Sequence, residues 1–259
     1  MKIKLTDLDR VHDLWDQLAD YKVSDFERSR RYFLESLCKL LGSENALWIG
    51  AVRMNHSAGD TLNGWRVASI HKRVSQESTQ PLMTTKLKAI QDGSADIITI
   101  HRVAMAGTFR VHRLVDIAPE GWFESDYYRK FYLGAGVGDS LWAGIPLNED
   151  AELYIGVNRG LEQHPFSEED VDTLSFTLKG LKWFHRLQML GEGLGIVSQP
   201  LTPTERKVLE GLLRGLSEKR VAAEYGQSQH TVHGHIKSIY KKYGVTSRSA
   251  LMALWLTAS

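Results

Sequence analysis

Cysteine is almost absent from this chain of 259 residues, which contains Cys38 alone. A single thiol excludes a framework of internal disulfides. Because Cys38 falls among the apolar positions of a predicted helix, we expect a buried small side chain and no redox switch. His101 and His112 lack the spacing of metal ligands and have no second cysteine to join them, so the sequence predicts no metal site.

Long apolar runs are also missing. No run of apolar residues approaches the twenty that a transmembrane helix needs, and the chain begins without a basic and apolar signal peptide. These features predict a cytoplasmic protein that makes no use of a membrane. A nucleophile elbow, a phosphate loop and a metal motif are absent too. We therefore expect no enzyme activity, no catalytic residues and no cofactor.

The chain lacks a strong net charge, but its formal charge of +1 conceals an uneven distribution. Residues 201–259 hold nine Lys and Arg against four Glu, a net charge of +5, which leaves −4 for the first 200 residues. A basic region of this kind is typical of nucleic-acid contact. With 42% hydrophobic residues, the chain has room for one substantial domain and one small domain.

The basic region carries signals for three successive helices. The stretch Thr202–Glu205 combines a hydroxyl cap, a proline at the first helical position and a glutamate that completes a capping box. Ser217 is placed to cap a second, short helix that ends at Gly226. A glycine there allows a left-handed turn, so the third helix, within 228–245, leaves at a steep angle. This order predicts a helix-turn-helix.

The third helix has two contrasting faces. At 3.6 residues per turn one stripe is apolar, comprising Val232, Ile236, Ile239, Tyr240 and Tyr243. The opposite stripe comprises His230, Gly234, Lys237 and Lys241, with His233 beside it. The apolar stripe is expected to pack, and the basic one has the geometry of a DNA-reading surface. The alternative for a basic stripe considered alone is a solvated face.

Four motifs stand at the spacing of a known family: Leu201-Thr202-Pro203-x-Glu205, Gly215-Leu216-Ser217-x-Lys219, Thr231-Val232-x-x-His235 and Lys242-x-Gly244-Val245-x-Ser247-Arg248. The region resembles the LuxR-type (GerE or NarL type) helix-turn-helix domain of bacterial transcription regulators. The resemblance implies that the third helix enters the major groove of double-stranded DNA. It also implies a fourth helix, from Arg248 to Trp255, that supplies a dimer contact and makes the protein a homodimer.

The resemblance implies two kinds of DNA contact. His233, Gly234 and Lys237 match base-facing positions, and Thr231, His235 and Lys241 match positions nearer phosphate. The complete predicted DNA-binding set is His230, Thr231, His233, Gly234, His235, Lys237, Lys241 and Lys242. Lys237 is suited to donate to guanine, whereas Lys241 and Lys242 are suited to phosphate.

Gly234 departs from the family pattern, which often has a branched apolar residue at this position. A glycine offers no methyl group to a thymine and weakens a helix interior by about 1 kcal/mol. The usual operator pattern of the family is therefore not assumed for this chain.

The first 190 residues mix helices and strands. Helices are predicted at 7–20, at 24–41 with a capping box Ser24-x-x-Glu27, at 82–91, at 125–133, and at 167–190 behind a Ser167-x-x-Asp170 cap. Strands are predicted at 46–54, 64–70, 96–103, 109–115, 139–146 and 151–157. The last helix would be roughly 36 Å long as one unbroken element.

This order is similar to the GAF/PAS class of sensor domains. The resemblance covers about residues 25–190, with Pro165–Asp170 resembling the entry to the last helix. It implies an α+β fold whose antiparallel sheet, with flanking helices, holds a small ligand on one face. The acidic cluster of a receiver domain and the Trp/Tyr/Asp/Trp spacing of the acyl-homoserine-lactone domain are not found in the sequence.

Candidate ligand-binding residues are aromatic rings close to Arg or His. They are Trp65, Phe109, Arg110, His112, Trp122, Tyr127, Tyr128 and Trp142. Flat side chains beside a cation suit an aromatic or carboxylate-bearing metabolite. The alternative for each aromatic residue is a place in the core.

The predicted organisation is a GAF/PAS-like sensor or dimerisation domain at 1–190, a flexible glycine-rich linker at 191–200 and a DNA-binding domain at 201–259. The predicted function is a dimeric, DNA-binding transcription regulator modulated by a small molecule. The alternative makes the first domain a ligand-free dimerisation or protein-interaction module.

Overall fold

The computed structural model describes residues 3–54, 58–73, 88, 90–92, 95–194 and 200–258. Contacts divide the chain into two compact units. The first unit comprises Met1–Asp16 and Arg31–Gly180, and the second comprises Gln17–Arg30 and Leu181–Ser259. The predicted domains, in contrast, are continuous in sequence and have their boundary at residue 190. Among the described residues no helix has the length and apolar character needed to cross a membrane.

The first unit combines helices with a sheet. Its elements, in chain order, are α1 (Leu5–Ala19), α2 (Phe26–Leu40), β1 (Asn45–Arg53), β2 (Trp65–Arg73), α4 (Ile97–Ala104), β3 (Arg110–Arg113), α5 (Leu114–Ile117), η3 (Trp122–Glu124), α6 (Asp126–Phe131), η4 (Leu133–Ala135), β4 (Val137–Asn148), β5 (Ala151–Gly160) and α7 (Glu168–Lys179). The first residues of α2 and the last residues of α1 belong to the second unit.

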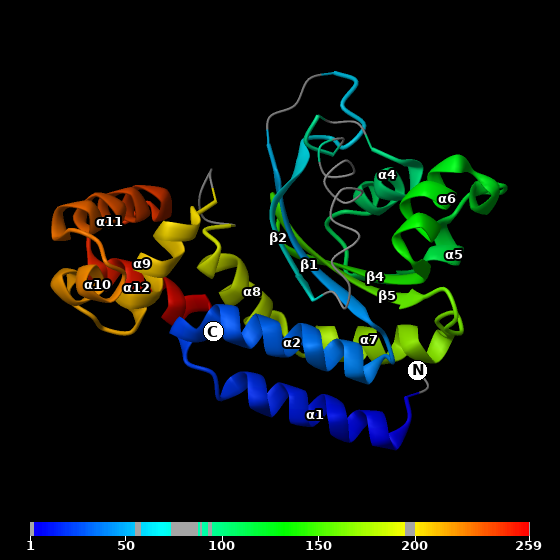
Figure 1. The fold of residues 1–259 in the computed structure, drawn as a ribbon, viewed down its shortest axis with the longest axis horizontal. Coiled ribbons are helices and arrows are strands. Elements are labelled where there is room, and N and C mark those ends of the chain that lie inside the picture. Colours follow the sequence, from blue (N-terminus) through cyan, green and yellow to red (C-terminus); the bar gives the residue numbers. More distant parts are fainter. Residues whose placement is uncertain are drawn as a thin grey trace. The chain divides into compact units, whose positions relative to one another are not determined.

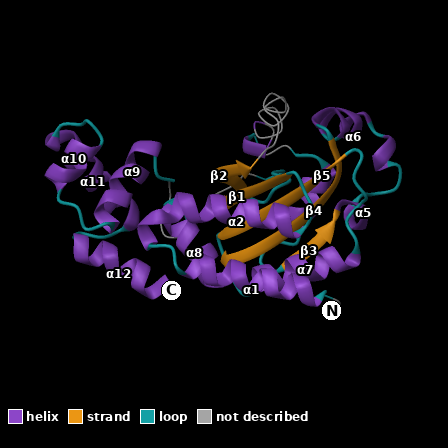
Figure 2. Ribbon diagram, turned by 60° about the horizontal axis from the view of Figure 1, so that its bottom comes forward, coloured by secondary structure: helices purple, strands orange, loops and turns teal. Residues whose placement is uncertain are grey.

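The five described strands form one antiparallel sheet in the order β2-β1-β5-β4-β3. Helices α2 and α7 cover one face, with α1 beside them, and α4 to α6 lie over the other face (Figures 1 and 2). The central strand β5 is buried along most of its length because both faces are covered. The predicted α+β class with a predominantly antiparallel sheet and flanking helices is confirmed.

The predicted strand at 96–103 is wrong, because this segment forms α4. The carboxylate of Asp96 accepts hydrogen bonds from the backbone N–H groups of Ile98 and Thr99, which caps the helix. Ile98 and Arg102, one turn apart, are buried on the same side. The isoleucines and threonine of this segment favour a strand locally, but the cap and the buried face favour the helix.

The predicted single helix at 167–190 is also wrong. It is divided into α7 and α8 (Lys182–Gly191). The indole Nε1 of Trp15 donates to the carbonyl of Thr177 at 3.0 Å, which is the acceptor that Leu181 would use in a continuous helix. A Cβ atom at Gly180 would lie only 2.3 Å from the Trp15 ring. The break therefore has a tertiary cause, the close approach of α1.

Helix caps in the first 190 residues agree only partly with the prediction. Ser167 and Asp170 form the predicted capping box at the start of α7. The predicted box of Ser24 and Glu27 is not formed, because Ser24 is buried inside a short 3-10 turn, η1 (Val23–Asp25), and α2 begins at Phe26. The predicted helix at 82–91 lies mostly outside the described residues.

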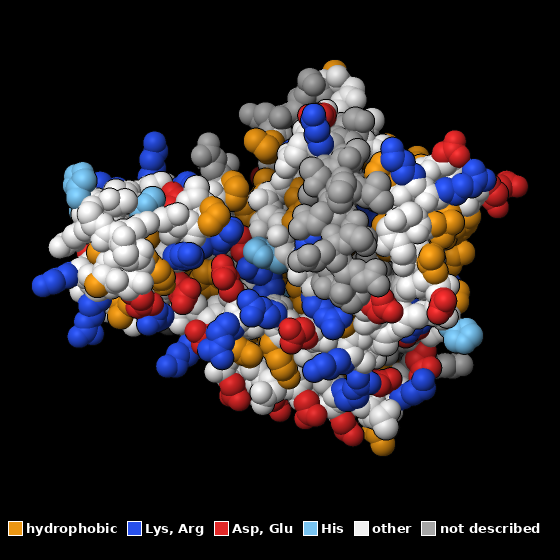
Figure 3. Space-filling model, viewed as in Figure 1, with side chains coloured by type: hydrophobic (Ala, Val, Ile, Leu, Met, Phe, Trp, Pro, Cys, Tyr) orange, Lys and Arg blue, Asp and Glu red, His pale blue; other side chains and the backbone are white. Residues whose placement is uncertain are grey.

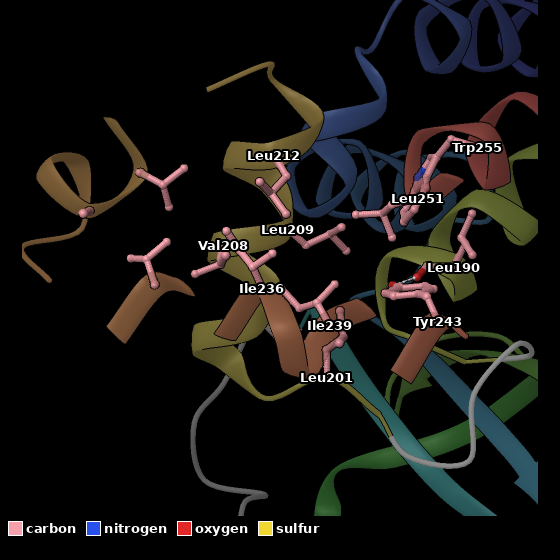
Figure 4. Packing of buried hydrophobic residues seen from close by; sticks show 13 residues of the cluster. Leu190, Leu201, Val208, Leu209, Leu212, Ile236, Ile239, Tyr243, Leu251 and Trp255 are labelled. Carbon is pink, nitrogen blue, oxygen red and sulfur yellow. Dashed lines mark hydrogen bonds between the residues drawn. The ribbon is translucent and has the colours of Figure 1, made fainter. Parts of the chain in front are cut away.

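The second unit is almost entirely helical. Its described elements after α8 are α9 (Pro203–Leu213), α10 (Glu218–Glu224), α11 (Gln229–Tyr243) and α12 (Arg248–Ala258). Their apolar side chains form one core, comprising Leu190, Leu201, Val208, Leu209, Leu212, Val221, Ala222, Val232, Ile236, Ile239, Tyr243, Leu251 and Trp255 (Figure 4). The Tyr243 hydroxyl also donates to the carbonyl of Leu190. This core joins α8 to the four following helices.

The predicted caps of the second unit are present. Thr202 and Glu205 form a capping box with Pro203 at the start of α9. The side chains of Ser217 and Ser228 cap α10 and α11. Gly226, between these two helices, has a φ of 63°, a conformation that favours glycine. The backbone of the turn therefore follows from local sequence.

The glycine-rich segment after α8 is packed, although the sequence predicts a flexible linker from residue 191. Gly191, Gly193 and Leu194 are buried, and Glu192 is completely shielded from solvent. The carboxylate of Glu192 forms ion pairs of 2.8 Å with Arg30 and with Arg206. Residues 191–194 are thus part of the second unit. Residues 195–199 of the predicted linker lie outside the described residues.

Candidate functional sites

Helix α11 separates its side chains as the sequence predicts. Val232, Ile236, Ile239 and Tyr243 are buried in the core of the second unit, and Tyr240 is half-buried. The predicted DNA-facing positions His230, Thr231, His233, Gly234, Lys237 and Lys241 are exposed, and His235 is half-buried. Figure 3 shows Lys, Arg and His side chains over the surface of the α9–α11 region. The helix therefore presents a basic face to solvent.

Lys242 differs from the other predicted DNA contacts because it is engaged inside the unit. Its ammonium group lies 2.6 Å from a carboxylate oxygen of Glu205 and 3.0 Å from the carbonyl of Pro200. Its side chain is mostly covered. Lys242 therefore fixes the end of α11 against the start of α9.

Glu205 is the centre of this arrangement. Its carboxylate accepts from the Ser238 hydroxyl at 2.6 Å and from the Thr202 N–H at 2.7 Å, in addition to Lys242. Burial alone raises the pKa of this carboxyl, but the donors and the Lys242 charge outweigh it and lower the pKa to about 2. Glu205 is therefore ionised at neutral pH and connects α9 to α11.

The turn of the helix-turn-helix is joined by polar contacts. His233 Nδ1 lies 3.2 Å from a carboxylate oxygen of Glu218 in α10, and the hydroxyls of Thr231 and Ser228 are 2.8 Å apart. Lys219 and Arg220 at the start of α10 are also exposed, although the predicted site omits them. Their position directly after the Ser217 cap, at the start of the second predicted helix, could have marked them in the sequence as further basic residues of this surface.

Gly234 lies on the exposed face of α11 with open space around it. A Cβ atom at this position would meet no heavy atom within 4 Å. Packing within the chain therefore does not require a glycine here. The lack of a side chain leaves the backbone of the helix open to a close approach by a ligand.

Helices α9 to α12 define the chain as one with a helix-turn-helix domain, in which α10, the turn at Gly226 and α11 are the characteristic part. Residues 199–255 match the model of the bacterial regulatory proteins of the luxR family. This stretch is a domain of that family, and the predicted LuxR-type resemblance is confirmed for it.

Similar proteins include a probable HTH-type transcriptional regulator, GfsR, of Streptomyces halstedii, 39% identical over 59 residues, which are 23% of this chain and 24% of that protein. The transcriptional regulatory protein UhpA of Escherichia coli is 46% identical over 48 residues, 18% of this chain and 24% of UhpA. The chain thus matches about a quarter of the length of these relatives. The VqsR LBD domain from Pseudomonas aeruginosa has a TM-score of 0.49 at 14% identity and covers 69% of this chain and 96% of that structure.

A second candidate site is a cavity of about 190 Å³ in the first unit. Strands β1, β2, β4 and β5 supply one wall, and α4, α6 and η4 contribute to the other. Its described lining is Asn45, Leu47, Ile49, Ala51, Leu62, Trp65, Arg66, Val67, Ile70, Arg73, Ile90, Thr99, Arg102, Val103, Phe131, Tyr132, Ala135, Val137, Ser140, Trp142, Tyr154 and Asn158. Most of this wall is apolar, with a few polar groups.

The predicted ligand-binding residues occupy three different places. Trp65 and Trp142 line the cavity, and Arg110 and His112 lie behind cavity residues, with hydrogen bonds to Tyr154 and Arg102 respectively. The other four, which are not part of the described cavity lining, are Phe109, Trp122, Tyr127 and Tyr128. Of the eight predicted residues, two line the cavity and two are hydrogen-bonded to residues that line it.

The four residues outside the lining have structural contacts. The ammonium group of Lys179 in α7 lies 5.1 Å from the centre of the Phe109 ring. The rings of Trp122 and Tyr128 pack 5.1 Å apart in an aromatic cluster, and the Tyr127 hydroxyl donates to Asp96. Trp122, Tyr127 and Tyr128 therefore belong to the helical layer of η3 and α6, whereas Phe109 contacts α7.

The cavity also contains groups that the sequence prediction missed, chiefly Arg102 and Tyr154. The guanidinium of Arg102 lies 4.3 Å from the centre of the Trp142 ring, and its Nε donates to His112 Nε2 at 3.3 Å. Burial, followed by the charges of Arg102 and Arg110, lowers the pKa of His112 to about 3. His112 is therefore neutral and can accept this hydrogen bond.

Small residues make room for these side chains in the sheet. Trp142 lies opposite Gly156 on the neighbouring strand, where a Cβ atom would be 2.7 Å from the indole. Gly144 makes room in the same way for Arg110, whose guanidinium pairs with Glu152 at 2.6 Å. Trp142 thus lies close to the backbone of β5, with Arg102 above its ring.

Proposed function

We propose that the chain is a bacterial transcription regulator that binds double-stranded DNA through α11. The observation that carries this proposal is the exposed basic face of α11 within a domain of the luxR family. His233, Gly234 and Lys237 are the proposed base-facing residues, and Thr231, His235 and Lys241 are the proposed phosphate-facing ones. His230 is proposed to contact DNA without an assigned role. Lys242 belongs to the Glu205 network and acts on DNA only indirectly.

The test is K237A, compared with K207A as a matched control for the loss of one charge. Lys207 is also exposed but lies on α9. K237A is expected to weaken binding to a selected operator by about tenfold to a hundredfold and to relax its sequence preference. Binding is measured by fluorescence anisotropy at fixed salt with specific and random duplexes. Equal losses for both duplexes, or an equal effect of K207A, would reject Lys237 as a base contact.

We further propose that the first unit binds a small molecule that modulates DNA binding, in the manner of a sensor domain. The cavity of about 190 Å³ on one face of the sheet supports this over the alternative of a ligand-free dimerisation module. Fluorescence anisotropy with operator DNA, with and without a bound ligand, tests the coupling. An unchanged dissociation constant at saturating ligand would favour the alternative.

We also propose a cytoplasmic homodimer without enzymatic activity, since two reading helices would match two half-sites of an operator. A helix-turn-helix bound as a dimer reads half-sites one helical turn apart. Native mass spectrometry of the full chain tests the subunit count. A monomer at micromolar concentration, both free and on DNA, would reject the dimer.

A further inference from the structure

We propose that the cavity binds a small molecule with one carboxylate and an apolar body, and that Arg102 is the residue that pairs with the carboxylate. This inference deepens the proposed sensing function by naming the class of ligand. Its evidence lies in the charges, hydrogen bonds and volume of the first unit alone.

Arg102 is a buried cation without a counter-charge among the described residues. It is only 5% exposed, and no carboxylate of the described chain lies within 4.0 Å of its guanidinium. Its Nη2 is buried and has no hydrogen-bond partner there. Burying a charge without a partner is unfavourable, and a guanidinium in a cavity wall is completed by an anion.

Arg110 in the same unit has a buried Nε without a partner among the described residues, but its charge, unlike that of Arg102, is paired with a carboxylate. Its two terminal nitrogens contact both carboxylate oxygens of Glu152, at 2.6 and 3.0 Å. It also donates to the carbonyl of Arg102 at 2.7 Å. The chain therefore provides one buried carboxylate for Arg110, and that carboxylate is already used in a two-pronged contact.

His112 does not supply the missing charge. With its pKa lowered to about 3, the ring is neutral and offers only a lone pair to Arg102 Nε. This bond and the stacking on Trp142 fix the plane of the guanidinium. The Nη2 hydrogens have no acceptor among the described residues, and we assign them to the ligand.

The indole Nε1 of Trp142 is a second unused donor. It is buried and lacks a partner among the described residues, and Trp142 lines the same cavity as Arg102. Buried donors of native proteins are nearly always satisfied, so two unused donors on residues of one cavity wall indicate an acceptor that the described residues do not provide. A carboxylate accepts through two oxygens.

The other two cations of the described lining are less buried than Arg102, and one of them has a carboxylate partner. Arg66 pairs with Asp60 at 2.9 Å, and Arg73 donates to the carbonyl of Glu44. The two asparagines and Ser140 are uncharged, and Ser140 donates to Asn158 at 2.8 Å. Arg102 is the most deeply buried of the three arginines of the described lining, so we assign it the selection of the ligand's charge.

The rest of the cavity wall determines the polarity and size of the part of the ligand that does not carry the carboxylate. Leu47, Ile49 and Ala51 of β1 face the cavity together with Leu62, Val67 and Ile70, and these side chains favour an apolar group. An apolar protein cavity of about 150 Å³ holds one benzene molecule. A space of about 190 Å³ therefore suits one ring or a short alkyl chain with a carboxylate.

The test measures binding of four acids and their amides to the full chain by isothermal titration calorimetry. The probes are benzoate, phenylacetate, hexanoate and octanoate, each beside the amide of the same shape. At least one acid is expected to bind about tenfold or more tightly than its amide, because its hydrogen bonds to Arg102 are charge-assisted. The proposal is overturned if no acid binds, or if every acid and its amide bind equally.

The variant R102M removes the charge and keeps an unbranched side chain. The preferred acid is expected to lose its tenfold advantage over the amide in R102M and to keep part of it in R102K. An unchanged preference in R102M would also overturn the proposal. None of these measurements uses DNA, so a failure of the proposed DNA binding leaves their outcome unaffected and is recognised separately with K237A.

Thermal unfolding of the ligand-free chain gives a second, independent readout. R102M is expected to raise the midpoint of unfolding, because it removes a buried charge that has no partner. R110M is the matched control, expected to lower the midpoint because it leaves Glu152 buried and unpaired. A lowered midpoint in R102M would assign Arg102 a structural role and contradict the proposal.

Discussion

The two compact units treat buried arginines differently. In the second unit, the buried Arg30 and the half-buried Arg206 share the carboxylate of the fully buried Glu192. In the first unit, Arg110 has Glu152, but Arg102 has no carboxylate among the described residues. The second unit thus supplies its own anion to hold its helices together. In the first unit, the arginine that lacks a carboxylate partner, Arg102, lines a cavity. We interpret the paired arginines as structural charges and Arg102 as a charge that binds a ligand.

The largest effect is expected from breaking the internal network of the second unit. E192Q would remove the anion that the buried Arg30 and the half-buried Arg206 share, and it is expected to lower the free energy of unfolding by about 3–5 kcal/mol. Urea denaturation measures the change. E120Q is the control, since it removes the same charge at an exposed position. If the two variants have similar stability, the Glu192 network does not stabilise the unit.

The next effect is a pH dependence located in the first unit. The pKa of His112 is about 3 in the folded chain, against 6.5 for an unperturbed histidine. The unfolded chain therefore binds the proton more readily, and stability is complete above pH 6.5 and falls as the pH decreases toward 3. By pH 4.5 the loss is about 3 kcal/mol.

The variant H112Q is expected to flatten the slope of stability against pH between 6.5 and 4.5, as measured by urea denaturation at a series of pH values. H164Q, which removes an exposed histidine, is the matched control. A slope that persists in H112Q would show that His112 is not the group that titrates.

Glu205 gives the second unit a different pH window. Its pKa is about 2 when folded and 4.5 when unperturbed, so its contribution to stability is present above pH 4.5 and is lost as the pH falls toward 2. About 2 kcal/mol is expected to be lost by pH 3. E205Q should remove this dependence, and a far-UV circular dichroism melt at each pH follows it because the second unit is mainly helical. An identical pH profile for E205Q and the unaltered chain would contradict this assignment.

The smallest effect is expected at Gly234, where one substitution should change the stability of the chain and its affinity for DNA in opposite directions. G234A is expected to stabilise the chain by about 1 kcal/mol, because alanine favours a helix interior and the added Cβ meets no neighbour. If Gly234 serves close approach to DNA, the same variant will bind operator DNA more weakly despite its greater stability. Thermal melting and anisotropy measure the two quantities. Stronger or equal DNA binding would show that the glycine has no role in recognition.

Local signals were sufficient for most of the helix-turn-helix. The caps at Thr202 and Ser217, the glycine turn at 226 and the apolar stripe of α11 each depend on residues within one or two turns. Lys242 is the exception, because its partner Glu205 lies 37 positions away in the chain. A basic residue at a helix position that the 3.6-residue period assigns to the surface gives no indication of such a distant partner.

Distant contacts also explain what could not be predicted in the first unit. The break between α7 and α8 depends on Trp15, more than 160 positions away from its acceptor Thr177. Arg102 was missed because its segment was interpreted as a strand, which would have placed successive side chains on opposite faces. As a helix, α4 places Arg102 one turn from Ile98, on the side that faces the cavity and its sheet.

The origin of the second unit from two stretches of sequence has a consequence for protein engineering. The luxR family match begins at residue 199. A fusion that exchanges the helix-turn-helix domain at that point would separate Arg206 from Glu192. It would also separate Tyr243 from the carbonyl of Leu190, which accepts its hydrogen bond and whose side chain belongs to the same core. To change the DNA specificity without losing these contacts, residues 17–30 and 181–194 would be exchanged together with the helix-turn-helix domain. Alternatively, only the exposed positions of α11 would be substituted.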